Sequence, residues 1–236
     1  MKAYLFFKNK SFVFLLALVF SFSYDTFGQY LTDSIDIDHI YQNRKKKFVK
    51  KNKYLQDIRS FDELNPTCVN ESDSAEYNYQ SETFYIKGNV NNVWNAYKNL
   101  SLPEIYSGHI ISFGFMYSKQ QKKLVYIDSN NYSGMNEGQV FFINLDLLGG
   151  LKKLIVAYEV TNVDEQNKVI QFCYIKNGIS EGSQKITLTK AENGITKVQH
   201  NTIYKSHSKL RDKYLYPGFH KKIVKEFHKN LIVSLK

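Results

Sequence analysis

The sequence predicts an α+β fold, in which an antiparallel sheet of about seven to eight strands packs against one long C-terminal helix. Two observations predict it. From residue 81 onward, runs with the composition of strands are separated by short turns. Strands joined by such short turns are antiparallel neighbours, because a parallel pair needs a longer crossover. The end of the chain instead carries an apolar stripe at helical spacing.

The first strand is expected at residues 83–87, and two short helices follow it. Val93, Tyr97 and Leu100 have the i, i+4, i+7 spacing of an amphipathic helix. Residues 101–106 predict a second short helix, with a proline in its first turn. Both helices therefore precede the main run of strands.

Seven further strands are expected after Gly108. They are separated by turn sequences such as Gly149-Gly150 and Asn177-Gly178. The predicted strands lie near residues 110–118, 123–128, 138–147, 152–163, 168–176, 183–190 and 194–205.

The final element is predicted to be a helix that begins after Pro217 and Gly218. Lysines cover one side of it, and the other side is apolar. The apolar positions are Phe219, Ile223, Val224, Phe227, Leu231, Ile232 and Leu235. At 1.5 Å per residue, about 18 residues span roughly 27 Å, which is long enough to cross the sheet.

Residues 1–28 predict a signal peptide. Lysines precede an apolar stretch at residues 12–22, and small residues at 26–28 form a cleavage site. The stretch is shorter than the roughly 20 residues of a spanning helix. We therefore expect an exported protein, periplasmic or extracellular. An uncleaved segment that anchors the protein in the envelope stays open.

Residues 29–80 are expected to form a basic extension that is partly helical or disordered, and residues 81–236 the main domain. The extension carries a cluster of cations: Arg44, Lys45, Lys46, Lys47, Lys50, Lys51 and Lys53. Such a cluster can contact an anionic membrane, or it can be a solvated arm. No nucleic-acid partner is expected, because no helix-turn-helix, zinc-knuckle or RNP pattern accompanies the charge.

The chain has two cysteines, Cys68 and Cys173. In an oxidising compartment they could form a disulfide that ties the extension to the sheet. Cys173 also lies in an apolar run, so a buried free thiol is the alternative. Two cysteines are too few for a structural zinc site of the usual kind.

The order of elements resembles the START-like, or SRPBCC, superfamily of helix-grip proteins. The resemblance covers residues 81–236 and includes residues 84–94, where a strand runs into a helix that carries Trp94. It implies that a curved sheet grips the C-terminal helix and encloses a cavity. Together with the predicted signal peptide, it indicates an exported bacterial member of the superfamily. The superfamily also includes cyclases, hydrolases and aromatases, so the resemblance leaves catalysis open.

No motif in the chain selects a reaction. Residues 178–182 match the G-x-S-x-G pattern, but they join two predicted strands, whereas a nucleophile elbow needs a strand that turns into a helix. The six histidines show no HExxH or comparable metal spacing. We expect no metal and no cofactor, and the sequence favours a binding protein over an enzyme.

Candidate ligand-binding residues are aromatic and polar side chains that could face such a cavity. They are Trp94, Phe113, Phe115, Phe141, Tyr158, Glu159, His200 and Phe227. Tyr158 and Glu159 are adjacent on one strand, so at most one of them should face the cavity unless a bulge intervenes. The aromatic residues could equally fill the core, and Glu159 could pair with a lysine on the other face.

Two functions follow from these expectations. The first is an exported protein that binds an apolar or amphiphilic small molecule between the sheet and the C-terminal helix. The alternative is a non-catalytic envelope or surface interaction protein with a closed core. A cavity of about 300 Å³ or more would favour the first function.

Overall fold

The computed structural model describes residues 31–40, 45–106, 108–129 and 132–235 of the 236-residue chain. The predicted signal peptide at residues 1–28 and the predicted membrane contact Arg44 lie outside these residues. Among the helices of the described segments, none is long and apolar enough to cross a membrane.

The predicted antiparallel sheet is confirmed. Its order is β1-β8-β7-β6-β5-β4-β2-β3, and every neighbouring pair is antiparallel. The strands are β1 (Asn78–Lys87), β2 (Ile111–Ser118), β3 (Lys123–Val125), β4 (Gln139–Leu147), β5 (Lys152–Asp164), β6 (Val169–Tyr174), β7 (Glu181–Lys190) and β8 (Ile195–Lys205). The first strand begins earlier than predicted, because it pairs with β8 from Asn78 onward.

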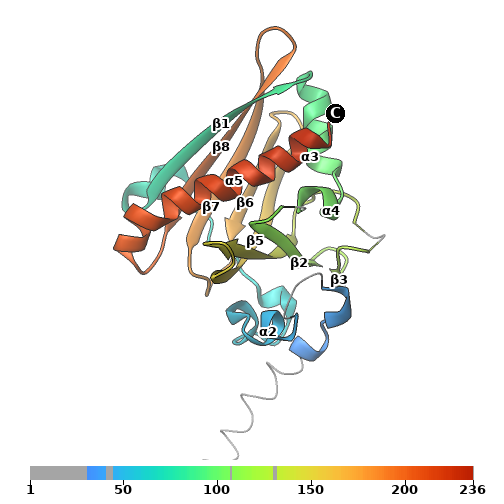
Figure 1. The fold of residues 1–236 in the computed structure, drawn as a ribbon, viewed down its shortest axis with the longest axis vertical. Helices are drawn as coiled ribbons and strands as arrows, with labels where there is room; N and C mark the ends of the chain where they lie inside the picture. Colours follow the sequence, from blue (N-terminus) through green and yellow to red (C-terminus); the bar gives the residue numbers. More distant parts are fainter. Residues whose placement is uncertain (1–30, 41–44, 107, 130–131, 236) are drawn as a thin grey trace, which may run out of the picture.

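The two short helices are α3 (Val90–Asn99) and α4 (Leu102–Ile105). The side chain of Asn89 caps α3, and Ser101 and Glu104 form a capping box on α4. The C-terminal helix α5 (Tyr216–Val233) continues a single π-helical turn, η5 (Arg211–Leu215), and crosses the curved sheet on its concave side (Figure 1). The order of helices and strands therefore agrees with the predicted one.

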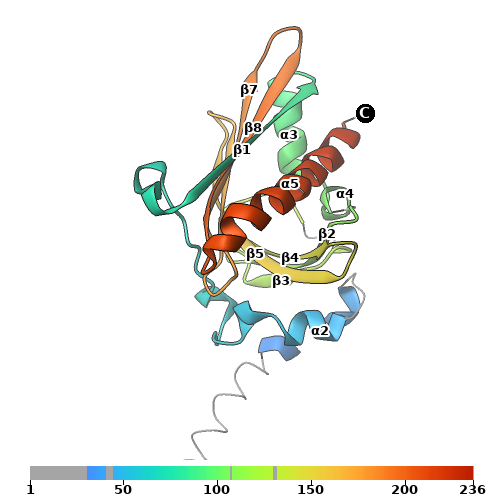
Figure 2. The ribbon, with the colours of Figure 1, turned by 60° about the vertical axis from the view of Figure 1, so that its left-hand side comes forward.

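The N-terminal segment covers the opposite face of the sheet (Figure 2). It consists of short elements: η1 (Ile37–His39), α2 (Lys45–Lys50), η2 (Lys53–Leu55), η3 (Phe61–Glu63) and η4 (Glu71–Glu76). Phe48, Leu55 and Phe61 from this segment are buried with Phe115 and Phe142 in a second hydrophobic core. The sheet thus has one core on each side over β2, β4 and β5.

This double covering explains why β4 is buried along almost its whole length. Phe141 belongs to the core under α5, whereas its neighbour Phe142 belongs to the core under the N-terminal segment. Strands that are covered on both faces read as continuous apolar runs rather than as alternating ones.

A β-bulge at Gly114 reverses the facing of β2. The pairing with β4 shifts register between Phe113 and Phe115, so Phe113 faces the core under α5 and Phe115 faces the other side. A Cβ atom at Gly114 would overlap the ring of Phe48. Glycine therefore lets the N-terminal segment approach the strand closely.

Cys68 and Cys173 form a disulfide, which decides between the two alternatives left by the sequence. The bond joins the segment before β1 to the central strand β6. The backbone N–H of Thr67 donates to the carbonyl of Tyr174 at 2.7 Å beside it. The covering segment is therefore held to the sheet by covalent and hydrogen bonds at its C-terminal end.

Candidate functional site

A cavity of about 620 Å³ lies between the concave face of the sheet and α5. Most of its walls are apolar side chains from β4, β5 and α5, among them Ile143, Leu145, Leu154 and Val224. Because one straight helix cannot fill the concavity of a curved sheet, space remains between them. The cavity has the size and the apolar character of a small-molecule site.

The helix wall of the cavity is set by the helical repeat of α5. Tyr216, His220, Val224 and Phe227 lie on one face of the helix, at spacings of four, four and three residues, and all four line the cavity. Pro217 lies in the first turn, where a missing backbone N–H costs no helical hydrogen bond.

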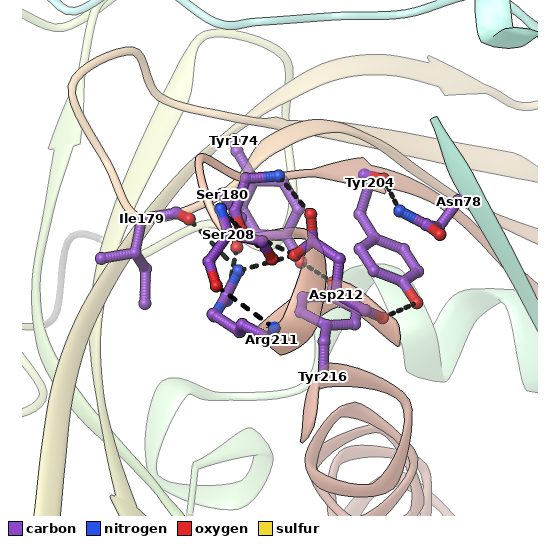
Figure 3. A network of polar contacts seen from close by, with 10 residues as sticks. Asn78, Tyr174, Ile179, Ser180, Tyr204, Ser208, Arg211, Asp212 and Tyr216 are labelled. Carbon is purple, nitrogen blue, oxygen red and sulfur yellow. Dashed lines mark hydrogen bonds and ion pairs between the residues drawn. The ribbon is translucent and has the colours of Figure 1, made fainter. Parts of the chain in front are cut away.

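A polar network fixes the end of the cavity near η5 (Figure 3). Arg211 donates to the carbonyl of Ile179 at 3.2 Å and to the hydroxyl of Ser180 at 2.8 Å. Asp212 is buried and accepts hydrogen bonds from the backbone and the hydroxyl of Ser206, both at 2.7 Å. The network joins η5 to the turn between β6 and β7.

Two pairs of tyrosines place hydroxyl groups at the cavity. Tyr106 hydrogen-bonds to Tyr158, and Tyr174 hydrogen-bonds to Tyr216 at 2.6 Å between the hydroxyl oxygens. Burial raises the pKa of all four phenols above its ordinary value. They therefore stay protonated and act as neutral hydrogen-bonding groups.

Histidines from the sheet and the helix meet at the cavity wall, where His200 and His220 line the cavity and His228 is fully buried beside them. The hydroxyl of Tyr97 lies 2.5 Å from Nδ1 of His228, and Nε2 of His228 lies 2.9 Å from Nδ1 of His200. Nε2 of His200 lies 2.9 Å from the side-chain oxygen of Gln184, and Nε2 of His220 lies 3.3 Å from the same oxygen. This series of hydrogen bonds connects α3 and α5 to β7 and β8.

Burial keeps these histidines neutral. It lowers the pKa of His220 to about 4 and that of His228 to about 3, and it lowers the pKa of His200 well below its usual value. Each neutral ring has one N–H, and the oxygen of Gln184 can only accept. The hydrogens of His200 and His220 therefore lie on Nε2. His228 then donates to His200 and accepts from Tyr97.

Comparison with solved structures gives the fold. Major latex-like protein 151 from Panax ginseng matches with a TM-score of 0.50 at 12% identity, over 68% of this chain and 98% of that one. This similarity agrees with the eight-stranded antiparallel sheet and the C-terminal helix described above. The chain has the START-like helix-grip fold.

Two further solved structures match with lower TM-scores. Norcoclaurine synthase from Thalictrum flavum has a TM-score of 0.49 at 10% identity, over 73% of this chain and 95% of that one. A START superfamily protein from Mycobacterium smegmatis has a TM-score of 0.46 at 10% identity, over 66% and 96%. No protein-family model and no curated protein matches the chain.

Three of the predicted ligand residues line the helix-grip cavity, namely Tyr158, His200 and Phe227. They come from β5, β8 and α5, and the structure brings them together although they are far apart in the sequence. Their side chains combine an aromatic wall with two polar groups.

Three other candidates pack in the same core without lining the cavity. Phe141 stacks on Tyr158, and Phe113 packs on Tyr106. Trp94 is almost fully buried and donates from its indole N–H to Glu165. Their roles fit the alternative weighed at the sequence level, which is filling of the core.

The prediction of Phe115 and Glu159 as cavity residues is corrected, because both lie on the opposite face of the sheet. The bulge at Gly114 turns Phe115 away from the cavity. Glu159 accepts a hydrogen bond from Lys119 at 2.6 Å, so it forms the lysine pair that was its alternative. Of Tyr158 and Glu159, only one faces the cavity.

Four cavity-lining residues are not among the predicted ligand residues, namely Tyr106, Gln184, Arg211 and His220. For His220 a signal existed, since it lies four and seven residues before Val224 and Phe227 on the predicted apolar stripe. Gln184 and Tyr106 show no periodic signal, because the tertiary pairing of distant strands places them.

The literal G-x-S-x-G match does not have the context of a nucleophile elbow, because a strand and not a helix follows it. Ser180 lies in a turn between strands and accepts a hydrogen bond from Arg211. No group of three or more His, Cys, Asp and Glu side chains in the described residues could hold a metal ion.

Proposed function

We propose that the protein is an exported binding protein that holds an apolar or amphiphilic small molecule between the sheet and α5. The observation that carries the proposal is the cavity of about 620 Å³. Sites for small molecules commonly enclose about 300–1,000 Å³ and combine apolar walls with a few polar groups. The alternative with a closed core does not agree with a cavity of this size.

Burial of apolar ligand surface would drive binding, at about 25 cal/mol per Å². The hydroxyl groups of Tyr106 and Tyr158 and the side chains of Gln184 and His200 would orient a polar end of the ligand. These four groups are neutral, so they favour a hydroxyl, carbonyl or amide. Of the two cations that also line the cavity, Lys152 and Arg211, Arg211 is already paired with Asp212. No reaction follows from these groups, and the proposal is a binding function.

Export is part of the proposal. The predicted signal peptide at residues 1–28 carries it, and the disulfide between Cys68 and Cys173 supports it, because structural disulfides persist in oxidising compartments. The proposal also includes peripheral contact with an anionic membrane through the basic residues between 44 and 53.

Binding of the neutral fluorescent probe N-phenyl-1-naphthylamine tests the proposal. Val156 lines the cavity, and its neighbour Ile155 packs toward the second core. We expect Val156→Trp to fill the cavity and to weaken probe binding at least tenfold. Ile155→Trp is the matched control and should keep the affinity of the wild type.

Equal binding by both variants, or no probe binding by the wild type, would contradict the proposal. Native mass spectrometry of protein purified from its own envelope fraction gives a second measurement. A small molecule that co-purifies with the wild type and is lost from Val156→Trp is expected.

A further inference from the structure

An apolar turn projects at the open end of the cavity. The turn between β4 and β5 has Leu148 and Leu151 at its corners, with exposed fractions of 62% and 89%. Between them, Gly149 and Gly150 have positive φ angles, and no atom lies within 4 Å of where their Cβ atoms would be. Leu148 also lines the cavity. The turn therefore stands free of the fold at the cavity entrance.

A second apolar group lies across the entrance on η5 and the residue before it. Leu210, Tyr214 and Leu215 are exposed, and Leu215 lines the same cavity as Leu148. Ile179 lines the cavity as well, and its carbonyl binds Arg211 of η5. The two apolar groups thus border one opening.

Lysines surround this apolar rim. Lys47, Lys51 and Lys53 of the covering segment line a hollow of about 440 Å³ together with Leu151 and Lys152. Within the described residues, none of the three lysines from the covering segment forms an ion pair with a carboxylate. Their charge is therefore available to a partner.

Two carboxylates at this end of the molecule, Asp146 and Asp212, are already engaged. Asp146 pairs with Lys153 at 3.2 Å, and Asp212 binds Ser206 and Arg211. Lys209 and Lys213 add further positive charge beside Leu210 and Tyr214. The entrance is thus an apolar rim within a positively charged surface.

We propose that this entrance docks on an anionic lipid surface, with Leu148 and Leu151 inserted among the acyl chains and the lysines on the headgroups. Apolar side chains on projecting turns, bordered by cations, match the boundary between headgroups and acyl chains. The cavity would then open into the bilayer, and a ligand could pass between them without crossing water. This last step rests on the proposed function.

Flotation with vesicles tests docking. Protein purified after export should bind vesicles that contain phosphatidylglycerol and should bind pure phosphatidylcholine vesicles much less. Lys47→Ala, Lys51→Ala and Lys53→Ala combined should weaken binding on the order of 100-fold, because each lysine contributes about a factor of five. High salt should weaken it as well.

Matched controls come from other exposed surfaces. Lys222, Lys225 and Lys229 lie on the exposed side of α5, so their triple Ala variant loses the same charge and should bind as the wild type does. Leu148→Ser with Leu151→Ser should weaken binding about tenfold or more. Tyr85→Ser with Val233→Ser removes exposed apolar groups elsewhere and should have no effect.

Insertion has its own readout. The emission of Leu151→Trp should shift to the blue on anionic vesicles, and that of Val233→Trp should not. Absence of vesicle binding at low salt, or equal losses in the entrance variants and their controls, would overturn the docking proposal. Binding of N-phenyl-1-naphthylamine without vesicles is measured separately, so failure of docking and failure of the proposed function are distinguishable.

Discussion

Three buried histidines link α5 to the sheet while they are neutral. In the unfolded chain, His200, His220 and His228 would take up protons near their ordinary pKa of about 6.5. In the folded protein, burial holds the pKa of each below that value. Below pH 6.5 the unfolded state therefore binds more protons than the folded state, and the free energy of unfolding decreases as the pH is lowered.

We predict that the free energy of unfolding decreases by on the order of 4 kcal/mol for each unit by which the pH is lowered between about pH 6 and pH 5. In this range all three histidines are protonated in the unfolded chain and neutral in the folded protein. The loss begins near pH 6.5 and is complete for His220 and His228 below their pKa values of about 4 and 3. His39 acts in the opposite sense, because Asp128 raises its pKa, but it is a single exposed group.

Urea unfolding at pH 7, 6 and 5 measures this dependence. His228→Phe should reduce the slope of the free energy of unfolding against pH by the contribution of about one proton, whatever its effect on stability at neutral pH. His109→Phe, at an exposed position, is the control and should keep the full slope. A free energy of unfolding that stays constant between pH 7 and pH 5 would rule out neutral buried histidines.

A substitution at Glu159 is expected to change stability without changing ligand binding. Its carboxylate accepts from Lys119, which also donates to the carbonyl of Leu64 at 2.7 Å. Glu159→Gln should lower the free energy of unfolding by about 1–3 kcal/mol, because a mostly buried lysine loses its charged partner. Probe affinity should not change, since the residue faces away from the cavity. An altered affinity would place Glu159 back at the site.

For individual residues, the sequence correctly predicted which face of the sheet some side chains lie on, and it failed for others. Alternation along β5 correctly allowed only one of Tyr158 and Glu159 to face the cavity. The same alternation failed in β2, because the bulge at Gly114 inserts a residue and gives Phe113 and Phe115 opposite faces. A bulge depends on the partner strand, so one strand read alone does not reveal it.

Among the elements, the covering segment depends on its disulfide. The bond between Cys68 and Cys173 closes a loop with a sequence separation of 105 residues. Cys68→Ser with Cys173→Ser should therefore lower the free energy of unfolding by about 2–5 kcal/mol. Urea unfolding of the double variant and of the wild type with and without dithiothreitol measures it. A wild type that dithiothreitol leaves unchanged at equilibrium would contradict the prediction.

The covering segment was also the element that sequence patterns described least. Its buried residues Tyr54, Leu55 and Phe61 lie in 3₁₀ turns of three residues, which are too short to produce a repeat. Apart from the three-residue β3, the strands and α5 are long enough to show their periods. Their predicted positions agree with the structure to within a few residues, except that β1 begins earlier. Periodicity reveals an element only when the element contains several repeats.

For the whole molecule, a ligand that binds only the folded protein should stabilise it. At a concentration of 100 times the dissociation constant, the gain is about 2.7 kcal/mol. We predict that N-phenyl-1-naphthylamine at such an excess raises the midpoint of urea unfolding of the wild type. Val156→Trp should show no such shift, and Ile155→Trp should show all of it. A shift in all three would indicate binding outside the cavity.

The order of elements could be predicted, and the contents of the cavity could not. A strand or a helix produces a periodic pattern in the sequence. A cavity, by contrast, depends on how completely side chains from many elements pack against one another. Ile143, Val156 and Val224 line the cavity, and each would be equally at home in a filled core. Ligand identity is therefore beyond what residue patterns record.

The contact between Phe48 and Gly114 has an evolutionary consequence. The two residues are 66 positions apart, yet the aromatic ring occupies the space that any larger side chain at position 114 would need. Descendants that keep the aromatic residue should keep glycine at the bulge. Lineages that have lost the covering segment should be free to accept larger residues there. An alignment that shows these two positions varying independently would argue that the segment joined the sheet recently.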